Sequence, residues 1–142
     1  MIRAILDTNV LVQAAFSSPR SASCRVLRAH DDGKFLLVFS PSTLDEFLEV
    51  LLVPRIRAAH GWSDDQVLQY VRSFLPHAVL CPGTPVVPAS LPRDVTDTKF
   101  LALAAEAGAD YLVTNDRRHL LRLRRFQMTQ IVTPAQFLKE LK

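Results

Sequence analysis

The chain has 142 residues, of which 49% are hydrophobic and 22% charged, with a net charge of +3 and a sequence pI of about 9.2. This length suits one domain built around one core, so we expect residues 1–142 to form a single domain. The hydrophobic content argues against a disordered chain. The longest apolar runs are far shorter than a bilayer span, which excludes a membrane helix. Asp7 follows the start too closely for a secretory signal peptide, and Cys24 and Cys81 are isolated. We therefore expect a cytoplasmic protein with two reduced, partly buried thiols.

The predicted elements alternate between strands and helices along the chain. Apolar runs predict strands at 3–6, 35–39, 78–80, 111–114 and 131–132, with a further short strand at 86–87 inside the proline-containing loop 82–94. Helical periodicity and capping signals predict helices at 21–30, from Ser40-Pro41 to near Pro54, at 63–74, from Asp97 to Gly108, and at 135–141. This alternation predicts an α/β fold of three layers, α/β/α, with a mostly parallel, Rossmann-like central sheet.

Four acidic residues fall near the ends of these elements: Asp7, Glu46, Asp97 and Asp116. Asp7 ends one apolar run, and Asp116 closely follows another. In an open α/β sheet such positions lie at the carboxyl ends of the strands, where ligands bind. Carboxylates gathered there repel one another unless a cation neutralises them. The pattern predicts a site for a hard metal ion bound through oxygen atoms.

Most of these acids also have a purely structural explanation. Asp7 and Asp116 belong to a residue type that is common in turns and helix caps, and either Asp94 or Asp97 could cap the helix that begins beside them. Asp97 is the better metal candidate of the two, because it immediately precedes the strongly apolar helix.

Glu46 lies in the early part of its predicted helix, where an acid also complements the helix dipole. Its neighbours Leu44 and Phe47 are apolar, so Glu46 should border the buried face of the helix. Asp45 and Glu49 are expected to face solvent instead. Glu46 is therefore the acid of this segment that we predict to reach the site.

The order and spacing of these acids resemble those of the PIN domain family of metal-dependent nucleases. The resemblance covers essentially the whole chain, and the segment 131–138 also resembles the end of the VapC-like branch, which comprises toxins of type II toxin–antitoxin systems. The motifs that carry it lie at residues 7–11, 42–47, 93–101, 109–116 and 131–138. The fold implied is the PIN-like form of the three-layer architecture.

The resemblance implies a function and a set of site residues. The implied function is a metal-dependent endoribonuclease with Mg²⁺ or Mn²⁺ as cofactor, leaving a 5′-phosphate and a 3′-hydroxyl. The implied catalytic and metal-binding residues are Asp7, Glu46, Asp97 and Asp116, and the implied site-lining residues are Asn9, Thr114 and Asp94. Two positions depart from the family pattern: Thr98 removes a possible polar contact near the metal, and Val95 should loosen the loop before Asp97. Neither departure removes one of the four acids.

We hypothesise that Asp7 and Asp116 bind one ion directly and that Asp97 completes or bridges a second site. Glu46 would orient the attacking water or bind metal through it. Metal ions suit phosphodiester hydrolysis because they generate a nucleophile at neutral pH and stabilise the charge that develops on the phosphate.

The segment 117–125 contains five arginines and follows Asp116 directly. We expect Arg117, Arg118 and Arg122 to bind the phosphate backbone of an RNA substrate. The alternatives are a solvated helix face or a surface for an acidic partner. The resemblance implies such a partner, a cognate antitoxin, and also a homodimer. Whether Leu51, Leu52 and Val53 belong to the core or to a dimer surface stays open.

Three rival interpretations use the same residues. A haloacid-dehalogenase-type phosphatase would need a second aspartate two residues after Asp7, but Asn9 stands there and cannot act as an acid. A receiver domain would need an acidic pair after the first strand and a phosphoacceptor after the third, and the sequence has neither. A non-catalytic interaction module of the same fold is the remaining rival, and the presence of all four acids argues against it.

Overall fold

The computed structural model describes residues 1–82 and 98–141. Asp94, Asp97 and the strand predicted at 86–87 lie outside the described residues.

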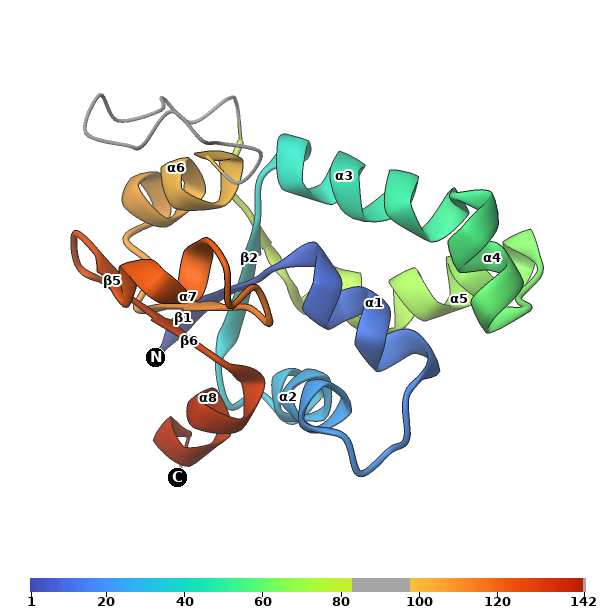
Figure 1. Cartoon of the computed structure of the whole chain (residues 1–142), viewed down its shortest axis with the longest axis horizontal. Helices are drawn as coiled ribbons and strands as arrows, with labels where there is room; N and C mark the ends of the chain where they lie inside the picture. The colour runs from blue at the N-terminus through green and yellow to red at the C-terminus, as the bar shows by residue number, and fades with distance from the viewer. Residues whose placement is uncertain (83–97, 142) are drawn as a thin grey trace.

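A six-stranded sheet forms the centre of the molecule, in the order β3-β2-β1-β4-β6-β5 (Figure 1). Every pair of neighbouring strands is parallel except β5 with β6, which form an antiparallel ribbon at one edge. The strands are β1 Arg3–Leu6, β2 Leu36–Phe39, β3 Val79–Leu80, β4 Tyr111–Val113, β5 Arg125–Phe126 and β6 Thr129–Val132. The predicted mostly parallel sheet is confirmed.

Helices cover both faces of this sheet, and among them α2 and α8 lie side by side, as do α1 and α3 (Figure 1). The helices are α1 Thr8–Phe16, α2 Ala22–Asp31, α3 Pro41–Leu52, α4 Pro54–His60, α5 Asp64–Phe74, the 3₁₀ turn η1 Leu75–His77, α6 Thr98–Ala107, α7 Leu120–Leu123 and α8 Pro134–Glu140. No helix within these described segments is long and apolar enough to cross a membrane.

The two faces of the sheet carry two separate cores, as the period-2 alternation of β1 shows. Ala4 and Leu6 point to the larger core, which they share with residues of α1, α2, α3, α5 and α8. Ile5 points to the smaller core beneath α6 and α7. The large core is rich in aromatic side chains: Phe47 packs on Phe74 with ring centroids 5.8 Å apart. The three-layer arrangement follows from these two buried faces.

The local signals in the sequence place many element ends within a residue or two. Ser63 and Gln66 form the predicted capping box at the start of α5, and Thr133 caps α8 in the same way. Gly108 follows the last residue of α6 with φ of +60°, which glycine adopts without steric cost. Cys24 and Cys81 are free thiols of intermediate exposure, as predicted.

Five elements do not follow from the sequence patterns: α1, α4, η1, α7 and β5. Helix α4 begins at Pro54, the residue at which the preceding helix was predicted to stop, because proline is tolerated in a first helical turn. Leu51 is fully buried, which assigns it to the core, whereas Leu52 and Val53 are 50% and 38% exposed.

Candidate active site

The carboxyl end of β1 is a point where the strand order reverses. The chain runs from β1 to its neighbour β2 on one side, while β4 pairs with β1 on the other side. Ligands bind in open α/β sheets at such switch points. Leu6 pairs with Val113, and the Asp7 N–H donates to the Val113 carbonyl at 2.9 Å. The residues that follow β1 and β4 are thereby brought together.

Asp7 occupies the N-cap position of α1, but within the described residues its side chain makes no capping hydrogen bond to that helix. Its Oδ2 instead accepts a hydrogen bond from Thr114 Oγ1 at 2.7 Å and from Asn9 Nδ2 at 3.2 Å. The residue is only 5% exposed. A buried carboxylate that is not used as a cap favours the functional interpretation of Asp7 over the structural one.

Thr114 joins the two loops of the site. Its hydroxyl donates to Asp7 Oδ2 and accepts from the Asp116 backbone N–H at 2.9 Å, and the side chain is fully buried. A second connection runs through Asn9, whose Oδ1 accepts from the Asn115 N–H at 3.3 Å. These bonds fix the loop that follows β4 against the start of α1.

Glu46 approaches the same site from the second turn of α3. One of its carboxylate oxygens accepts a hydrogen bond from the Thr8 hydroxyl, and the other lies 2.8 Å from Lys99 Nζ. Asp45 and Glu49 on the same helix are exposed, as predicted. Because both Glu46 oxygens are held by donors from different elements, the orientation of this carboxylate is well defined.

Asp116 has a structural role in addition to its place at the site. Its Oδ1 accepts from the backbone N–H groups of Arg118 and His119 at 3.1 and 3.2 Å, and its Oδ2 accepts from Leu120 at 3.4 Å. These bonds hold the turn that leads into α7. The side chain is therefore both a turn former and a wall of the site.

These acids line one cavity of about 770 Å³. Its lining includes three of the four predicted catalytic residues, Asp7, Glu46 and Asp116, and the predicted site-lining Asn9. Thr114 does not line the cavity but donates a hydrogen bond to Asp7. The cavity is lined by Asp7, Thr8, Asn9, Val12, Gln13, Phe16, Glu46, Val50, Ile56, Asn115 and Asp116.

The donor set of this cavity fits a hard divalent cation. Residues 1–82 and 98–141 contain no group of three or more His, Cys, Asp or Glu side chains that could hold a metal ion by themselves. However, Mg²⁺ keeps several waters and is commonly bound through only one or two protein carboxylates. The carboxylates of Asp7, Glu46 and Asp116 and the amide of Asn9 supply oxygen donors to the cavity. Oxygen donors of this kind suit Mg²⁺ or Mn²⁺.

Several residues at the site were not predicted from the sequence. Thr8 and Lys99 hold Glu46, and Gln13 accepts from Asn115 Nδ2 at 2.9 Å. Helical spacing from Asn9 would have placed Gln13 and Phe16 on the same face, but only once residues 8–16 were recognised as a helix. The contact of Lys99 with α3 joins elements far apart in the chain and has no local signal.

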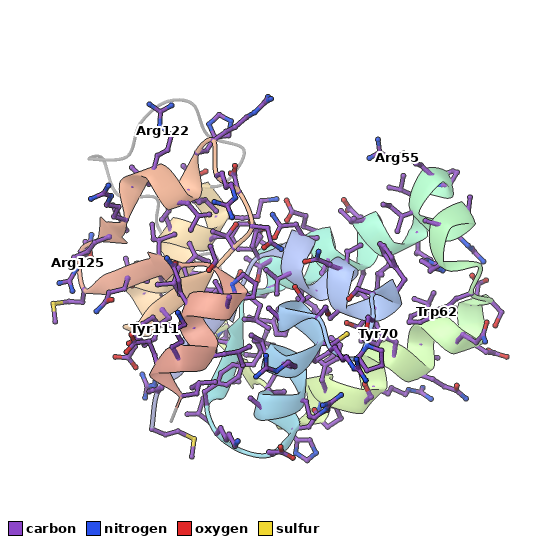
Figure 2. All side chains as sticks on the ribbon, turned by 60° about the horizontal axis from the view of Figure 1, so that its bottom comes forward. Arg55, Trp62, Tyr70, Tyr111, Arg122 and Arg125 are labelled. Atoms are coloured by element: carbon purple, nitrogen blue, oxygen red, sulfur yellow. The ribbon has the colours of Figure 1, made fainter. Side chains whose placement is uncertain are left out.

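The arginines of segment 117–125 are all exposed. Arg117, Arg122 and Arg124 line a second hollow of about 630 Å³, whereas Arg118 does not line it. Arg122 and Arg125 project from the opposite side of the molecule to Arg55 and Trp62 (Figure 2). The segment forms a short helix and an edge strand rather than one continuous helix face.

A comparison with protein families finds that a family model described as PIN domain matches residues 3–118. The match includes the three described acids and both loops of the cavity. None of the curated proteins compared with the chain matches it.

Proposed function

The chain belongs to the PIN domain family, whose members are generally nucleases that use divalent metal ions, and on this premise we propose that it is a Mg²⁺- or Mn²⁺-dependent endoribonuclease. We further propose that it acts as the toxin of a toxin–antitoxin pair in the cytoplasm. The observation that carries the nuclease proposal is the cavity at the carboxyl end of β1, which Asp7, Glu46 and Asp116 line together.

The proposed roles of Asp7, Glu46 and Asp116 follow from how each side chain is held, and that of Asp97 follows from the family resemblance. Asp7 and Asp116 would hold the ion, with Asp97 completing the set, and Glu46 would orient the water that attacks the phosphate. When bound, the ion would lower the pKa of water and offset charge on the phosphate. Thr114 and Asn9 orient Asp7 through hydrogen bonds to Oδ2. Such supporting bonds matter because they fix ligand orientation before substrate arrives.

The arginine segment supports RNA as substrate. Asp116 holds the turn at Arg118 and His119, so the acidic cavity and the basic segment are joined directly. We propose that Arg117, Arg118 and Arg122 bind phosphates on one side of the cleavage site. The same charges would also suit an acidic segment of a cognate antitoxin.

A homodimer is proposed as the assembly. Leu52 and Val53 are exposed apolar residues at the end of α3, and a second copy of the chain would cover such residues. Analytical ultracentrifugation of the purified chain tests this assembly, and a monomer at micromolar concentration would contradict it.

The nuclease proposal is tested by incubating the purified chain with single-stranded RNA and single-stranded DNA of the same sequence. Cleavage of RNA with Mg²⁺ or Mn²⁺, its loss with EDTA and a 3′-hydroxyl on the product are expected. Cleavage that persists in EDTA would contradict the metal dependence, and equal cleavage of DNA would contradict the specificity for RNA. The toxin role is tested separately: induction should arrest growth, and a small protein encoded beside the gene should relieve the arrest.

A non-catalytic PIN module remains the second candidate, because Lys99 already neutralises Glu46 and Asp116 already serves the turn. Calorimetric titration with Mn²⁺ separates the two functions. An inert module would bind Mn²⁺ no better than an Asp7→Asn variant does.

A further inference from the structure

The cavity that contains the acids extends beyond them into an apolar end. This end is lined by Val12 and Phe16 of α1, Val50 of α3 and Ile56 of α4. The acids are at the start of α1, on the early turns of α3 and after β4, so both ends of the cavity share α1 and α3. Whatever the acids bind therefore lies next to an apolar surface.

Phe16 is the unusual residue of this surface. All eight phenylalanines of the chain are among the described residues, and Phe16 alone is exposed, at 44% of its surface, whereas Phe35, Phe47 and Phe74 are fully buried. It is the last residue of α1, seven positions after Asn9 and thus two turns along the same helix face. An aromatic ring left in contact with water inside a cavity is available to a ligand.

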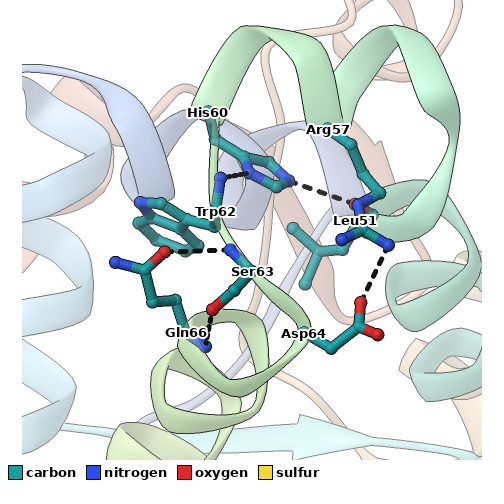
Figure 3. A network of polar contacts seen from close by, with 7 residues as sticks. All are labelled: Leu51, Arg57, His60, Trp62, Ser63, Asp64 and Gln66. Carbon is teal, nitrogen blue, oxygen red and sulfur yellow. Dashed lines mark hydrogen bonds and ion pairs between the residues drawn. The ribbon is translucent and has the colours of Figure 1, made fainter.

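The wall opposite α1 is held in place by a polar network around α4 (Figure 3). The backbone N–H of Trp62 donates to His60 Nδ1 at 2.9 Å. His60 Nε2 therefore carries the ring hydrogen and donates to the Leu51 carbonyl at 3.2 Å. Arg57 pairs with Asp64 at 2.8 Å. These contacts tie α4 to the end of α3 and the start of α5.

Helix α1 is fixed by the same region, because Tyr70 of α5 donates its hydroxyl hydrogen to the Leu11 carbonyl at 2.7 Å. The Trp62 and Tyr70 rings are in contact, with centroids 5.4 Å apart, and both labelled side chains lie together in Figure 2. The apolar end is thus a preformed pocket between α1, α3 and α4, which these contacts hold together.

We propose that this apolar end is a subsite for an unpaired nucleobase of the RNA, with Phe16 as its stacking surface, an inference that rests on the proposed nuclease function. A phosphodiester placed at the acids carries a sugar and a base on either side. A neutral aromatic ring flanked by valine and isoleucine suits the face of a base and not a phosphate. An unpaired base enters such a pocket without the cost of breaking a base pair, so the substrate class is single-stranded RNA.

A protein partner fits this pocket less well. The apolar end consists of four side chains inside a cavity whose other wall is acidic and polar. A stable protein interface needs a far larger surface with many side chains. The continuity with the acids favours the molecule that the acids act on.

The test measures binding of two fluorescent oligoribonucleotides of equal length, one with bases and one wholly abasic. All chains also carry Asp7→Asn so that the RNA stays intact. Phe16→Ala should weaken binding of the base-containing RNA by roughly 5- to 150-fold, the range expected for loss of one stacked base, and leave binding of the abasic RNA unchanged. Phe16→Trp should retain binding, because it keeps an aromatic face.

Leu68→Ala is the matched control, since Leu68 is 46% exposed on α5 and does not line the cavity. Its RNA affinity should not change, and the melting temperatures of both alanine variants should show folded proteins. Unchanged binding in Phe16→Ala would overturn the inference, as would equal weakening for both oligoribonucleotides. Loss of antitoxin binding without loss of RNA binding would overturn it in favour of a protein site.

Cleavage is measured separately on chains with native Asp7. If the chain cleaves RNA and Phe16→Ala does not weaken RNA binding, the base subsite is overturned and the nuclease proposal stands. If Phe16→Ala weakens binding of only the base-containing RNA but the chain with native Asp7 does not cleave RNA, the nuclease proposal alone is overturned.

Discussion

The acidic cavity and the arginine segment meet at Asp116 but differ in how their side chains are held. Asp7 and Thr114 are buried and joined by a hydrogen bond, and Glu46 is held by Thr8 and Lys99. The arginines of segment 117–125 are exposed. Reacting groups need a fixed geometry, whereas attraction of a polyanion needs only the sign and location of the charge. The difference predicts that substitutions in the two regions will fail in different ways.

The largest effect is expected from Asp7→Asn, which keeps the size of the side chain and removes its charge. RNA cleavage with Mg²⁺ or Mn²⁺ should fall below detection, because Asp7 is the most buried of the described acids. Gel assays of RNA cleavage, with circular dichroism to verify folding, check this result. Asp45→Asn, an exposed acid beside Glu46, should retain cleavage. Undiminished cleavage by Asp7→Asn would rule out the assignment of this cavity as the active site.

The next largest effect is expected from Thr114→Val. The variant removes the hydrogen bond to Asp7 and the acceptor for the Asp116 N–H. Activity should fall about 10- to 100-fold, as for other residues that orient metal ligands. Stability should fall by about 1–3 kcal/mol because a buried polar group loses its partner. Cleavage rates and urea unfolding measure the two effects.

Thr129→Val is the matched control for this experiment. Thr129 is also buried, at 2% exposure, and donates one hydrogen bond, to the Ala109 carbonyl at 2.7 Å, away from the acids. It should lose stability to a similar degree and keep its cleavage rate. Equal loss of cleavage in both variants would show that Thr114 acts only through stability.

A smaller effect, on binding rather than on chemistry, is expected from replacing Arg117, Arg118 and Arg122 together by Gln. The slope of log affinity against log salt concentration should fall by about 2, since each contact to a single strand contributes about 0.7. Fluorescence anisotropy from low to high salt measures the slope. The control replaces Arg25, Arg28 and Lys34, which line a separate hollow of about 290 Å³, and removes the same charge. An equal change of slope in the control would mean that net charge alone matters.

The smallest effect is expected from Lys99→Gln. The ion pair with Glu46 is partly exposed, with the two side chains at 32% and 26%, and such pairs contribute about 0.2–1 kcal/mol. Cleavage should therefore fall by no more than about fivefold, through a less ordered Glu46. Arg3→Gln provides the comparison, because the Arg3 guanidinium donates to the Ala107 carbonyl at the end of α6 at 3.0 Å and does not line the cavity. This variant should leave the rate unchanged. Glu46→Gln is measured alongside. If Lys99→Gln loses as much cleavage activity as Glu46→Gln does, Lys99 itself contacts the substrate.

The sequence by itself determined the layered α/β fold, many helix ends and which acids to examine. These depend on short-range physics: the apolar runs of the strands, the helical spacing of apolar residues, the caps at Ser63 and Thr133, and the glycine stop at Gly108. Glu46 could be chosen over Asp45 and Glu49 because helical spacing decides which side chains border the buried face.

Only the tertiary structure decided which groups the carboxylate oxygens of the acids bind. Asp7 and Asp116 have equally good local explanations as turn or cap residues. In the structure, Asp116 accepts hydrogen bonds that hold a turn, whereas the Asp7 carboxylate accepts one from Thr114, 107 residues away. The donors Thr8 and Lys99 and the apolar wall around Phe16 depend likewise on contacts between α1, α3, α4 and α6. Such contacts depend on how the helices pack across the sheet, and no local pattern in the chain encodes that packing.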